Sequence, residues 1–357
     1  MRYAVVMAGG TGTRFWPESR KAVPKQLLRL GSPFSLLERT IQRIESLIPP
    51  AQVLVVTSEN LRDSIRPHLP GTPDANLLFE PLRRNTGPCV ALAARVLLDR
   101  DPDAVMLVLA ADHLIQREDE FRAILSATMD LAAAEEVLIT LGISPVYPET
   151  GYGYIEMGPE LGRRDSRAYY RAAGFREKPS TETAVEYLAA GRFLWNSGMF
   201  VFRASTLWHA VQRHLPEVAR VLAHVDGRDE PEQIQKAIDE IYPGLPAVSI
   251  DIGVMEKAEN IVVFPADIGW SDVGSWTTLR SLLPADVHGN VAHGDNLTMH
   301  ASENIIYARD GIVVAIGVEN LIIVHTPDAT LVARRDDAQG IKRIFDELEK
   351  RGFDRYI

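Results

Sequence analysis

The sequence contains a single cysteine, Cys89, among 357 residues. One cysteine excludes an intramolecular disulfide and a cysteine-rich metal site, and this usage is typical of a reducing compartment, so we expect a cytoplasmic protein. No apolar run approaches the length of a membrane span, and the N-terminal run is too short for a secretory signal. None of the nine histidines has metal-ligand spacing.

A general excess of positive charge is absent as well. The formal net charge of −10 argues against a nucleic-acid binder or a binder of anionic membranes, whose affinity comes from a basic face. Any phosphate-binding charge must therefore be local. The length exceeds one average domain, and the composition is that of an ordinary globular protein, which predicts a large α/β domain with a smaller one.

Local positive charge does follow a glycine-rich stretch near the N-terminus. Residues 3–8 predict a buried strand, which runs directly into Gly9, Gly10, Thr11, Gly12 and Thr13. Glycines let successive backbone N–H groups point at an anion, and Arg14, Lys21 and Lys25 add charge nearby. The residues thus indicate a phosphate-binding loop, although a glycine-rich turn after a strand explains the glycines equally well.

Two common phosphate loops do not fit this stretch. A Walker A loop requires Lys and Ser/Thr directly after its second glycine, where Thr13 and Arg14 stand here. The dinucleotide-binding fingerprint requires a third small residue where Phe15 stands. Pro17 and Pro24 instead predict an extended basic loop.

Strands and helices alternate after this loop. We expect strands at 53–57, 76–80 and 104–110, and helices at 36–47, 59–68 and 86–99. This βαβ spacing predicts a parallel sheet covered on both faces, with ligands beyond the carboxyl ends of its strands. Residues 152–202 predict additions to a mixed sheet around a helix at 181–190, and residues 205–241 predict further helices.

The pattern of residue types changes after Pro284. Short Val- and Ile-rich segments between 289 and 333 predict a few coils of a small β-solenoid. A terminal amphipathic helix follows, with Ile341, Ile344, Phe345 and Leu348 on one face. That face has two candidate partners, the solenoid and a second subunit, so a homodimer stays open.

Two aspartates from distant segments form a candidate metal site. Asp112 directly follows a predicted buried strand, and Asp272 lies in a glycine-punctuated loop between two tryptophans. Magnesium typically takes one or two protein carboxylates and completes its shell with water and phosphate oxygens. An aspartate after a strand is also a common turn residue or helix cap.

Glu80 ends another predicted strand and is a candidate base reader. Guanine presents two adjacent donors, N1–H and its amino group, and a carboxylate accepts both, whereas uracil or thymine would oppose it with a carbonyl. Glu80 therefore favours guanine, against the alternative of a surface glutamate before a proline turn.

A third set suits a sugar phosphate. Glu177, Lys178 and Asn196 supply an acceptor, a cation and a two-way amide, and Gly153 allows close backbone approach. Each of these residues alone has a structural explanation. The aromatic residues Trp195, Phe200 and Phe202 are interpreted as core.

Taken in order, these segments resemble a known family. The motifs are GGTGTRFWPxSRxxxPKQ from Gly9, EPxxRNTGP from Glu80, ADH at Asp112, GYGYI from Gly151, EKP from Glu177, WNSGMF from Trp195, VME from Val254 and WSDVGSW from Trp270. Together they are similar to the mannose-1-phosphate guanylyltransferases within the sugar-nucleotide pyrophosphorylases, over nearly the whole chain. One departure is Gly87, where alanine is common.

The resemblance implies a fold and a set of roles. The expected fold is an α/β, Rossmann-like (GT-A-like) nucleotidyltransferase domain with a mixed, mostly parallel sheet at 1–284, and a tail at 285–357 with a small left-handed β-helix-like solenoid and a terminal helix. Longer members carry an additional phosphomannose isomerase domain, for which a chain ending at Ile357 is expected to have no room. The implied roles are catalytic for Arg14 and Lys25; nucleotide binding for Ala8, Gly9, Gly10, Thr11, Gly12, Thr13, Glu80, Asn85, Thr86 and Gly87; sugar-phosphate binding for Gly153, Glu177, Lys178 and Asn196; and binding of Mg²⁺ or another divalent cation for Asp112 and Asp272.

The implied reaction joins GTP and mannose 1-phosphate to give GDP-mannose and pyrophosphate. Two alternatives stay open: a guanylyltransferase for another sugar 1-phosphate such as glucose or a heptose, and a non-catalytic homologue that senses GDP-mannose. A silent homologue is expected to lose Arg14, Lys25 or an aspartate, and all are present here.

Overall fold

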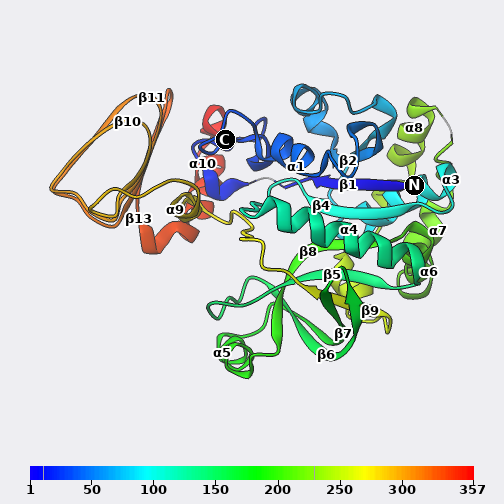
Figure 1. Cartoon of the computed structure of the whole chain (residues 1–357). Helices are drawn as coiled ribbons and strands as arrows, with labels where there is room; N and C mark the ends of the chain where they lie inside the picture. Colours follow the sequence, from blue (N-terminus) through cyan, green and yellow to red (C-terminus); the bar gives the residue numbers. More distant parts are fainter. Residues whose placement is uncertain (11, 229) are drawn as a thin grey trace. The chain divides into compact units, whose positions relative to one another are not determined.

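The computed structural model describes residues 1–10, 12–228 and 230–357 (Figure 1). They form two compact units, each built from several stretches of the chain. Unit 1 comprises Met1–Gly9, Thr40–Ala111 and Ile115–Trp270, and unit 2 comprises Gly10–Arg39, Asp112–Leu114 and Ser271–Ile357. Thr11, predicted to bind nucleotide, lies outside the described residues. The predicted boundary at 284/285 stays a prediction.

Unit 1 is organised around a nine-stranded sheet. Its strands are β1 (Arg2–Ala8), β2 (Val53–Ser58), β3 (Leu77–Glu80), β4 (Val105–Ala110), β5 (Leu138–Ile143), β6 (Gly153–Arg164), β7 (Arg167–Glu177), β8 (Phe193–Arg203) and β9 (Ile261–Pro265). The order is β3-β2-β1-β4-β8-β5-β9-β7-β6, and the pairings make β7 and β8 run against the others. The predicted mixed, mostly parallel sheet is confirmed.

Helices cover both faces of this sheet (Figure 1). On one face, α3 (Thr86–Arg100), α6 (Ala204–His214) and α7 (Pro216–Leu222) share a core with inward residues of β1, β2 and β4. On the other, α4 (Glu118–Ala134) packs on β4, β5 and β8. Strands β1, β2, β4 and β5 are consequently buried on both faces, which explains why they are nearly continuous apolar runs.

Local signals define some helices closely. Helix α5 runs from Thr181 to Ala190, as predicted, because the Ser180 side chain caps its first turn and Gly191 ends it with φ 66°. Helix α8 (Pro231–Ile241) covers the sheet edge at β3: the amide of Gln235 donates to and accepts from the backbone of Phe79. An edge strand is thereby closed to further pairing.

Two predicted helices are shorter than expected. The helix expected at 59–68 is only one α-turn, α2 (Arg62–Ile65), between two 3₁₀ turns, and Pro67 lies in the second of these. Proline lacks the N–H that a continuing α-helix would use. Helix α1 (Leu36–Ile44) ends three residues before the predicted limit at Leu47.

Unit 2 contains the predicted β-helix-like solenoid. Strands β10 (Val291–Met299), β11 (Ile305–Ile316) and β12 (Leu321–Thr326) pair in parallel, and β13 (Ala329–Arg334) pairs antiparallel with β12. At the turns, Asn304 Nδ2 donates to Asn290 Oδ1 at 3.0 Å, while Asn304 Oδ1 accepts from the Leu321 amide at 2.9 Å. This side-chain ladder repeats from coil to coil.

The terminal helix α10 (Ile341–Lys350) packs within unit 2, as does the short helix α9 (Leu279–Leu282). Ile341 and Phe345 are buried in a core that includes Trp16, and Leu348 packs at its edge. Ile344, predicted on the same face, is instead 44% exposed. The helix therefore uses a narrower stripe than the sequence suggested.

Candidate active site

A lysine and two aspartates meet in unit 2. Lys25 Nζ lies 2.7 Å from Asp112 Oδ2 and donates to the backbone carbonyl of Asp272 at 2.6 Å. The Lys25 side chain is only 11% exposed and that of Asp112 26%. One ammonium thus holds together the two residues that the sequence predicted for a metal ion.

Gly12 sets the position of Lys25. It has φ 61°, and a Cβ at this residue would lie 2.2 Å from the Cβ of Lys25. The Gly12 carbonyl accepts from the Ser19 hydroxyl at 2.7 Å and from the Phe15 amide at 2.9 Å. Arg14, in the short 3₁₀ turn η1 (Thr13–Phe15), is exposed, so its guanidinium is open to an anion.

The charge of Asp112 is set by its partners. Burial acts to raise the pKa of this carboxyl, but the Lys25 ammonium and His113 outweigh it and hold the pKa below its ordinary value. Asp112 is consequently ionised at neutral pH. His113 is a neighbour of Asp112, as interpreted from the sequence.

These residues fit a hard divalent cation. Carboxylate oxygens are the donors that magnesium prefers, and a Cβ at Gly274 would lie 3.3 Å from both carboxylate oxygens of Asp272, so the glycine leaves that side open. Val273 has φ 50°, a strained conformation for a β-branched residue, and such strain concentrates at functional sites. Among the described residues, no group of three His, Cys, Asp or Glu side chains could hold a metal, so an ion here would depend on two carboxylates with water and phosphate.

Glu80 ends β3 in unit 1 and is 6% exposed. The Tyr242 hydroxyl donates to Glu80 Oε1, and Oε2 lies 3.6 Å from where a Cβ of Gly9 would stand. Burial raises the pKa of Glu80 to about 7, against the opposing effects of the Tyr242 bond and Arg83. One carboxylate oxygen therefore faces Gly9, while the Tyr242 hydroxyl holds the other.

Three further nucleotide candidates lie at the start of α3. Asn85 has φ 66° and its side chain accepts from the Thr86 amide, and Thr86 Oγ1 accepts from the Ile250 amide at 3.0 Å. The Gly87 amide donates to the Val248 carbonyl at 2.9 Å, and a Cβ at Gly87 would lie 2.6 Å from that oxygen. Glycine rather than alanine at this position thus permits the close approach of residue 248.

The predicted sugar-phosphate residues cluster in unit 1. A Cβ at Gly153 would lie 2.7 Å from Glu177 Oε2 and 3.4 Å from the Asn196 Cβ. Glu177 Oε1 pairs with the Lys178 ammonium, and Lys178 has φ 46°. Trp195, predicted as core, is 4% exposed.

Two residues that were not predicted from the sequence, Asp251 and Tyr242, are partners of these clusters. Asp251, in the π-helical turn η8 (Asp251–Met255), accepts from Asn196 Nδ2 at 2.8 Å, and Tyr242 holds Glu80. Asp251 stands three residues before the VME motif at Val254, a signal that was available. No pattern marks Tyr242, because its partner is 162 residues away.

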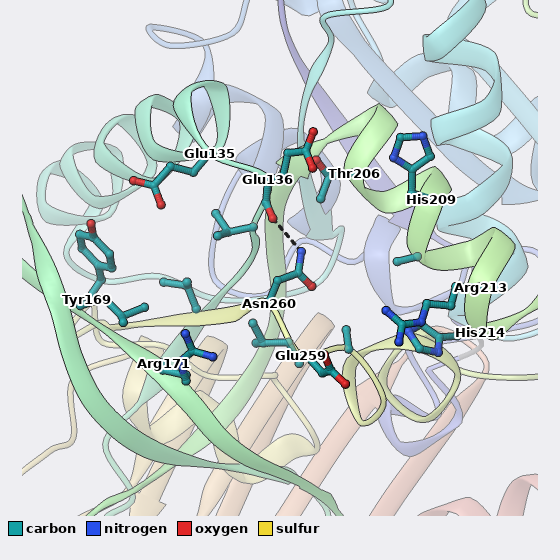
Figure 2. Close-up of a pocket in the computed structure, with 16 residues that line it drawn as sticks. Glu135, Glu136, Tyr169, Arg171, Thr206, His209, Arg213, His214, Glu259 and Asn260 are labelled. Atoms are coloured by element: carbon teal, nitrogen blue, oxygen red, sulfur yellow. Dashed lines mark hydrogen bonds between the residues drawn. The ribbon is translucent and has the colours of Figure 1, made fainter.

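A separate cavity of about 600 Å³ opens in unit 1 and holds none of the predicted site residues. Figure 2 shows charged side chains of both signs around it, with Arg171 on one side and Arg213 with His214 on the other. The Asn260 amide donates to the Glu136 carbonyl at 2.7 Å there.

Comparison with known proteins assigns the chain to a family. Residues 3–287 match the family model described as nucleotidyl transferase. Mannose-1-phosphate guanylyltransferase of Escherichia coli K12 is 38% identical over 98% of this chain and 74% of its own length, and mannose-1-phosphate guanylyltransferase 2 of Escherichia coli O157:H7 is 40% identical over 99% and 75%. The chain belongs to the nucleotidyl transferase family, in its mannose-1-phosphate guanylyltransferase branch.

The C-terminal solenoid region also has a match. Residues 294–348 of this nucleotidyl transferase match the MannoseP isomerase/GMP-like beta-helix domain. A solved structure from Thermus thermophilus, described as a mannose-1-phosphate geranyltransferase, has a TM-score of 0.87 and 36% identity over 98% of this chain and 99% of that one. Among the described residues, no helix is long and apolar enough to cross a membrane.

Proposed function

We infer that the chain transfers GMP from GTP to α-D-mannose 1-phosphate, giving GDP-mannose and pyrophosphate. The observation that carries this inference is the near-full-length similarity to mannose-1-phosphate guanylyltransferases, at 38% and 40% identity, in a chain that retains every predicted catalytic residue. The side-chain clusters supply the required chemistry: a carboxylate that faces a glycine, a lysine–aspartate pair and an acceptor-rich sugar cluster.

The reaction needs no protein nucleophile. A phosphate oxygen of mannose 1-phosphate attacks the α-phosphorus of GTP in line; the new P–O bond forms as the bond from the α-phosphorus to the bridging oxygen breaks, and pyrophosphate leaves with that oxygen. Transfers of this kind are accelerated by positioning and charge neutralisation. Arg14 and Lys25 supply positive charge, and the loop from Ala8 to Thr13 supplies backbone N–H groups.

A divalent cation belongs to this proposal. Asp112 and Asp272 would hold it, and when bound it would neutralise phosphate charge and align the reacting oxygens. Lys25, which pairs with Asp112 here, is then available for phosphate oxygens. The proposal thus includes GTP and mannose 1-phosphate as substrates and Mg²⁺ as the cation. It also includes a cytoplasmic location and a homodimer.

Glu80 would read guanine in this scheme. Its Oε2 accepts from the base, and the Tyr242 bond keeps Oε1 fixed. Asn85, Thr86 and Gly87 would bind the nucleotide through the strained start of α3. Gly153, Glu177, Lys178 and Asn196 would bind the sugar phosphate.

The test is pyrophosphate release by the purified chain with mannose 1-phosphate and magnesium, with GTP, ATP, UTP and dTTP in parallel. We expect release with GTP and its loss on addition of a chelator. Glucose 1-phosphate and a heptose 1-phosphate are assayed in parallel with mannose 1-phosphate. A higher kcat/KM with either of them would make that sugar phosphate the proposed substrate in place of mannose 1-phosphate. Binding of GDP-mannose without pyrophosphate release from any pair would support the sensor alternative instead.

A further inference from the structure

Asp251 is a largely buried carboxylate in the sugar-phosphate cluster that none of the predicted roles uses. It begins η8 and lies beside Asn196, whose Nδ2 donates to its Oδ1 at 2.8 Å. Glu177, Lys178 and Glu256 are the charged groups around it; Glu256 Oε1 accepts from the Glu177 amide at 3.3 Å. Asp251 and Glu177 thus lie close enough to repel one another electrostatically, with Lys178 as the cation beside them.

The amide of Asn196 has little capacity left for a sugar. Its Oδ1 accepts from the Thr140 hydroxyl and from the Gly198 amide, both at 3.2 Å, and one of its two N–H groups is used by Asp251. A primary amide offers two donors and two acceptor positions. One N–H therefore remains, and Asn196 serves chiefly as a fixed support for its neighbour.

The open hydrogen-bonding atoms of the cluster are carboxylate oxygens. The Asp251 carboxyl accepts from Asn196 and from its own backbone amide, and no other described side chain donates to it. Glu177 uses Oε1 for Lys178, and no described residue donates to its Oε2. The missing side chain of Gly153 leaves space beside the Glu177 oxygen. Ionised carboxylates only accept, so the ligand groups that they bind must be donors.

Asp251 occupies this position at an energetic cost. Burial, followed by the nearby charge of Glu177, raises its pKa to about 6, even though the Asn196 bond acts in the opposite direction. An asparagine would bind Asn196 through its own carbonyl oxygen without that cost. A carboxylate kept in such a position is typical of a site that needs the charge or the second acceptor.

We propose that Asp251 is a specificity-determining residue whose Oδ2 accepts a hydrogen bond from a ring hydroxyl of the sugar 1-phosphate. Glu177 Oε2 accepts a hydrogen bond from a neighbouring hydroxyl of the same sugar. This rests on the proposed function. Two neighbouring acceptors select a sugar with hydroxyls on nearby carbons, and they disfavour a deoxy or deoxyfluoro sugar at the contacted carbon, because a buried acceptor is then left unpaired.

The position of Asp251 also connects the sugar cluster to the nucleotide segment. The residues directly before it are bonded to the start of α3: Val248 accepts from Gly87 and donates to Arg84, and the Ile250 amide donates to Thr86. The specificity residue is therefore anchored to the segment predicted to bind nucleotide, within the same unit.

The experiment compares wild type, Asp251→Asn and a matched control, Asp63→Asn, whose carboxylate lies exposed on α2. Each is assayed with mannose 1-phosphate and with its 2-, 3- and 4-deoxy and deoxyfluoro analogues. We expect Asp251→Asn to lower kcat/KM for mannose 1-phosphate by about 10- to 100-fold, with the KM for GTP within twofold. The loss should vanish for the one analogue that lacks the contacted hydroxyl.

Two further readouts separate recognition from a merely structural role. In wild type, the KM for mannose 1-phosphate should rise as the pH falls through about 6, where Asp251 gains a proton. The substrate phosphate also titrates near this pH, but it does so equally with Asp251→Asn, so the difference between the two profiles reports Asp251. The Tm of Asp251→Asn should exceed that of wild type above pH 6, since the variant buries no charge.

The outcomes are distinguishable. A loss of equal size for every analogue, or kinetics like those of Asp63→Asn, would overturn the role of Asp251 while the proposed function stands. If wild type releases no pyrophosphate from GTP and mannose 1-phosphate, the proposed function fails first. Isothermal titration of wild type and Asp251→Asn with mannose 1-phosphate then tests the contact by itself, and equal affinities would overturn it.

Discussion

Glu80 ends a strand in unit 1 and Asp112 comes just after a strand in its sequence but belongs to unit 2, and their surroundings shift the two pKa values in opposite directions. Burial raises the pKa of Glu80 to about 7, and its partner is the neutral hydroxyl of Tyr242. Asp112 has the ammonium of Lys25 at 2.7 Å, which holds its pKa below the ordinary value.

The difference teaches that the partner, more than burial, decides the charge of a carboxyl group. A hydroxyl satisfies one oxygen without supplying charge, whereas an ammonium compensates the charge itself. The ionised Asp112 suits a cation and phosphates. Glu80, which titrates near neutrality, suits a neutral base with two donors.

The largest effect is expected where charge is essential. Asp112→Asn and Asp272→Asn should each lower kcat by about 100- to 1000-fold with magnesium. Each variant loses a carboxylate proposed to hold the cation that would neutralise the phosphate charge developing during transfer. The fold should persist, with Tm changed by only a few degrees. Asp346→Asn, an exposed change on α10 of the same unit, is the control. Wild-type rates in Asp272→Asn would rule out its assignment to the metal.

Lys25→Met tests whether the ammonium sets the charge of Asp112. The variant leaves a shielded carboxylate without its cation, which should lower the free energy of unfolding by about 3 kcal/mol at pH 8. In wild type, the lowered pKa of Asp112 gives stability above its ordinary pKa that is lost on acidification. In the variant, burial is opposed only by His113 and the backbone bond, so the pKa of Asp112 should be higher than in wild type and the stability gained above its ordinary pKa should shrink.

Denaturant unfolding at pH 4, 6 and 8 measures this difference. The gap between wild type and Lys25→Met should widen with pH, whereas Lys342→Met, an exposed change on α10, should track wild type throughout. A gap that is independent of pH would mean that Lys25 stabilises by packing alone.

Glu80→Gln tests the base reader. The substituted amide offers one acceptor and one donor, so kcat/KM for GTP should fall by about 10- to 100-fold, while UTP and dTTP gain relative to GTP. Pyrophosphate release with each nucleotide measures the ranking. Glu232→Gln, exposed on α8, is the control. An unchanged ranking would show that guanine is read elsewhere.

The smallest effect is expected from Tyr242→Phe. The hydroxyl bond lowers the pKa of Glu80, so its removal should raise that pKa by about one unit above 7. The KM for GTP should then rise a few-fold at pH 7 and match wild type at pH 8.5 to 9. Tyr170→Phe serves as the control, since the Tyr170 hydroxyl makes no hydrogen bond with a described residue. An unshifted pH profile would leave Tyr242 without a role in positioning Glu80.

Helices with strong local signals could be predicted to the residue. Ser180 and Gly191 fix both ends of α5, because capping uses only neighbouring backbone groups. The segment 59–68 shows the limit: its apolar spacing predicts a helix, but Pro67 breaks it into turns. The closure of β3 by Gln235 was also invisible, since it joins residues 156 positions apart.

The candidate site divides in the same way. Short motifs marked Glu80, Asp112, Glu177 and Asn196 as candidates, because each stands in a distinctive local context. Asp251 was missed, since its meaning comes from Asn196, 55 residues away. Gly87, a minor departure from the family pattern, gains its reason only from the carbonyl of residue 248.

The sequence by itself determined most strands of the sheet, though not β5 or β9, as well as the glycine loop, the solenoid and the residue types proposed for the chemistry. These features depend on periodicity and on local backbone preference. The tertiary structure alone decided which carboxyl groups are ionised and which oxygens remain open to a ligand. Glu80, Asp112 and Asp251 are equivalent as acids in a sequence. Burial and the partners that folding brings, a hydroxyl, an ammonium or an amide, make them different.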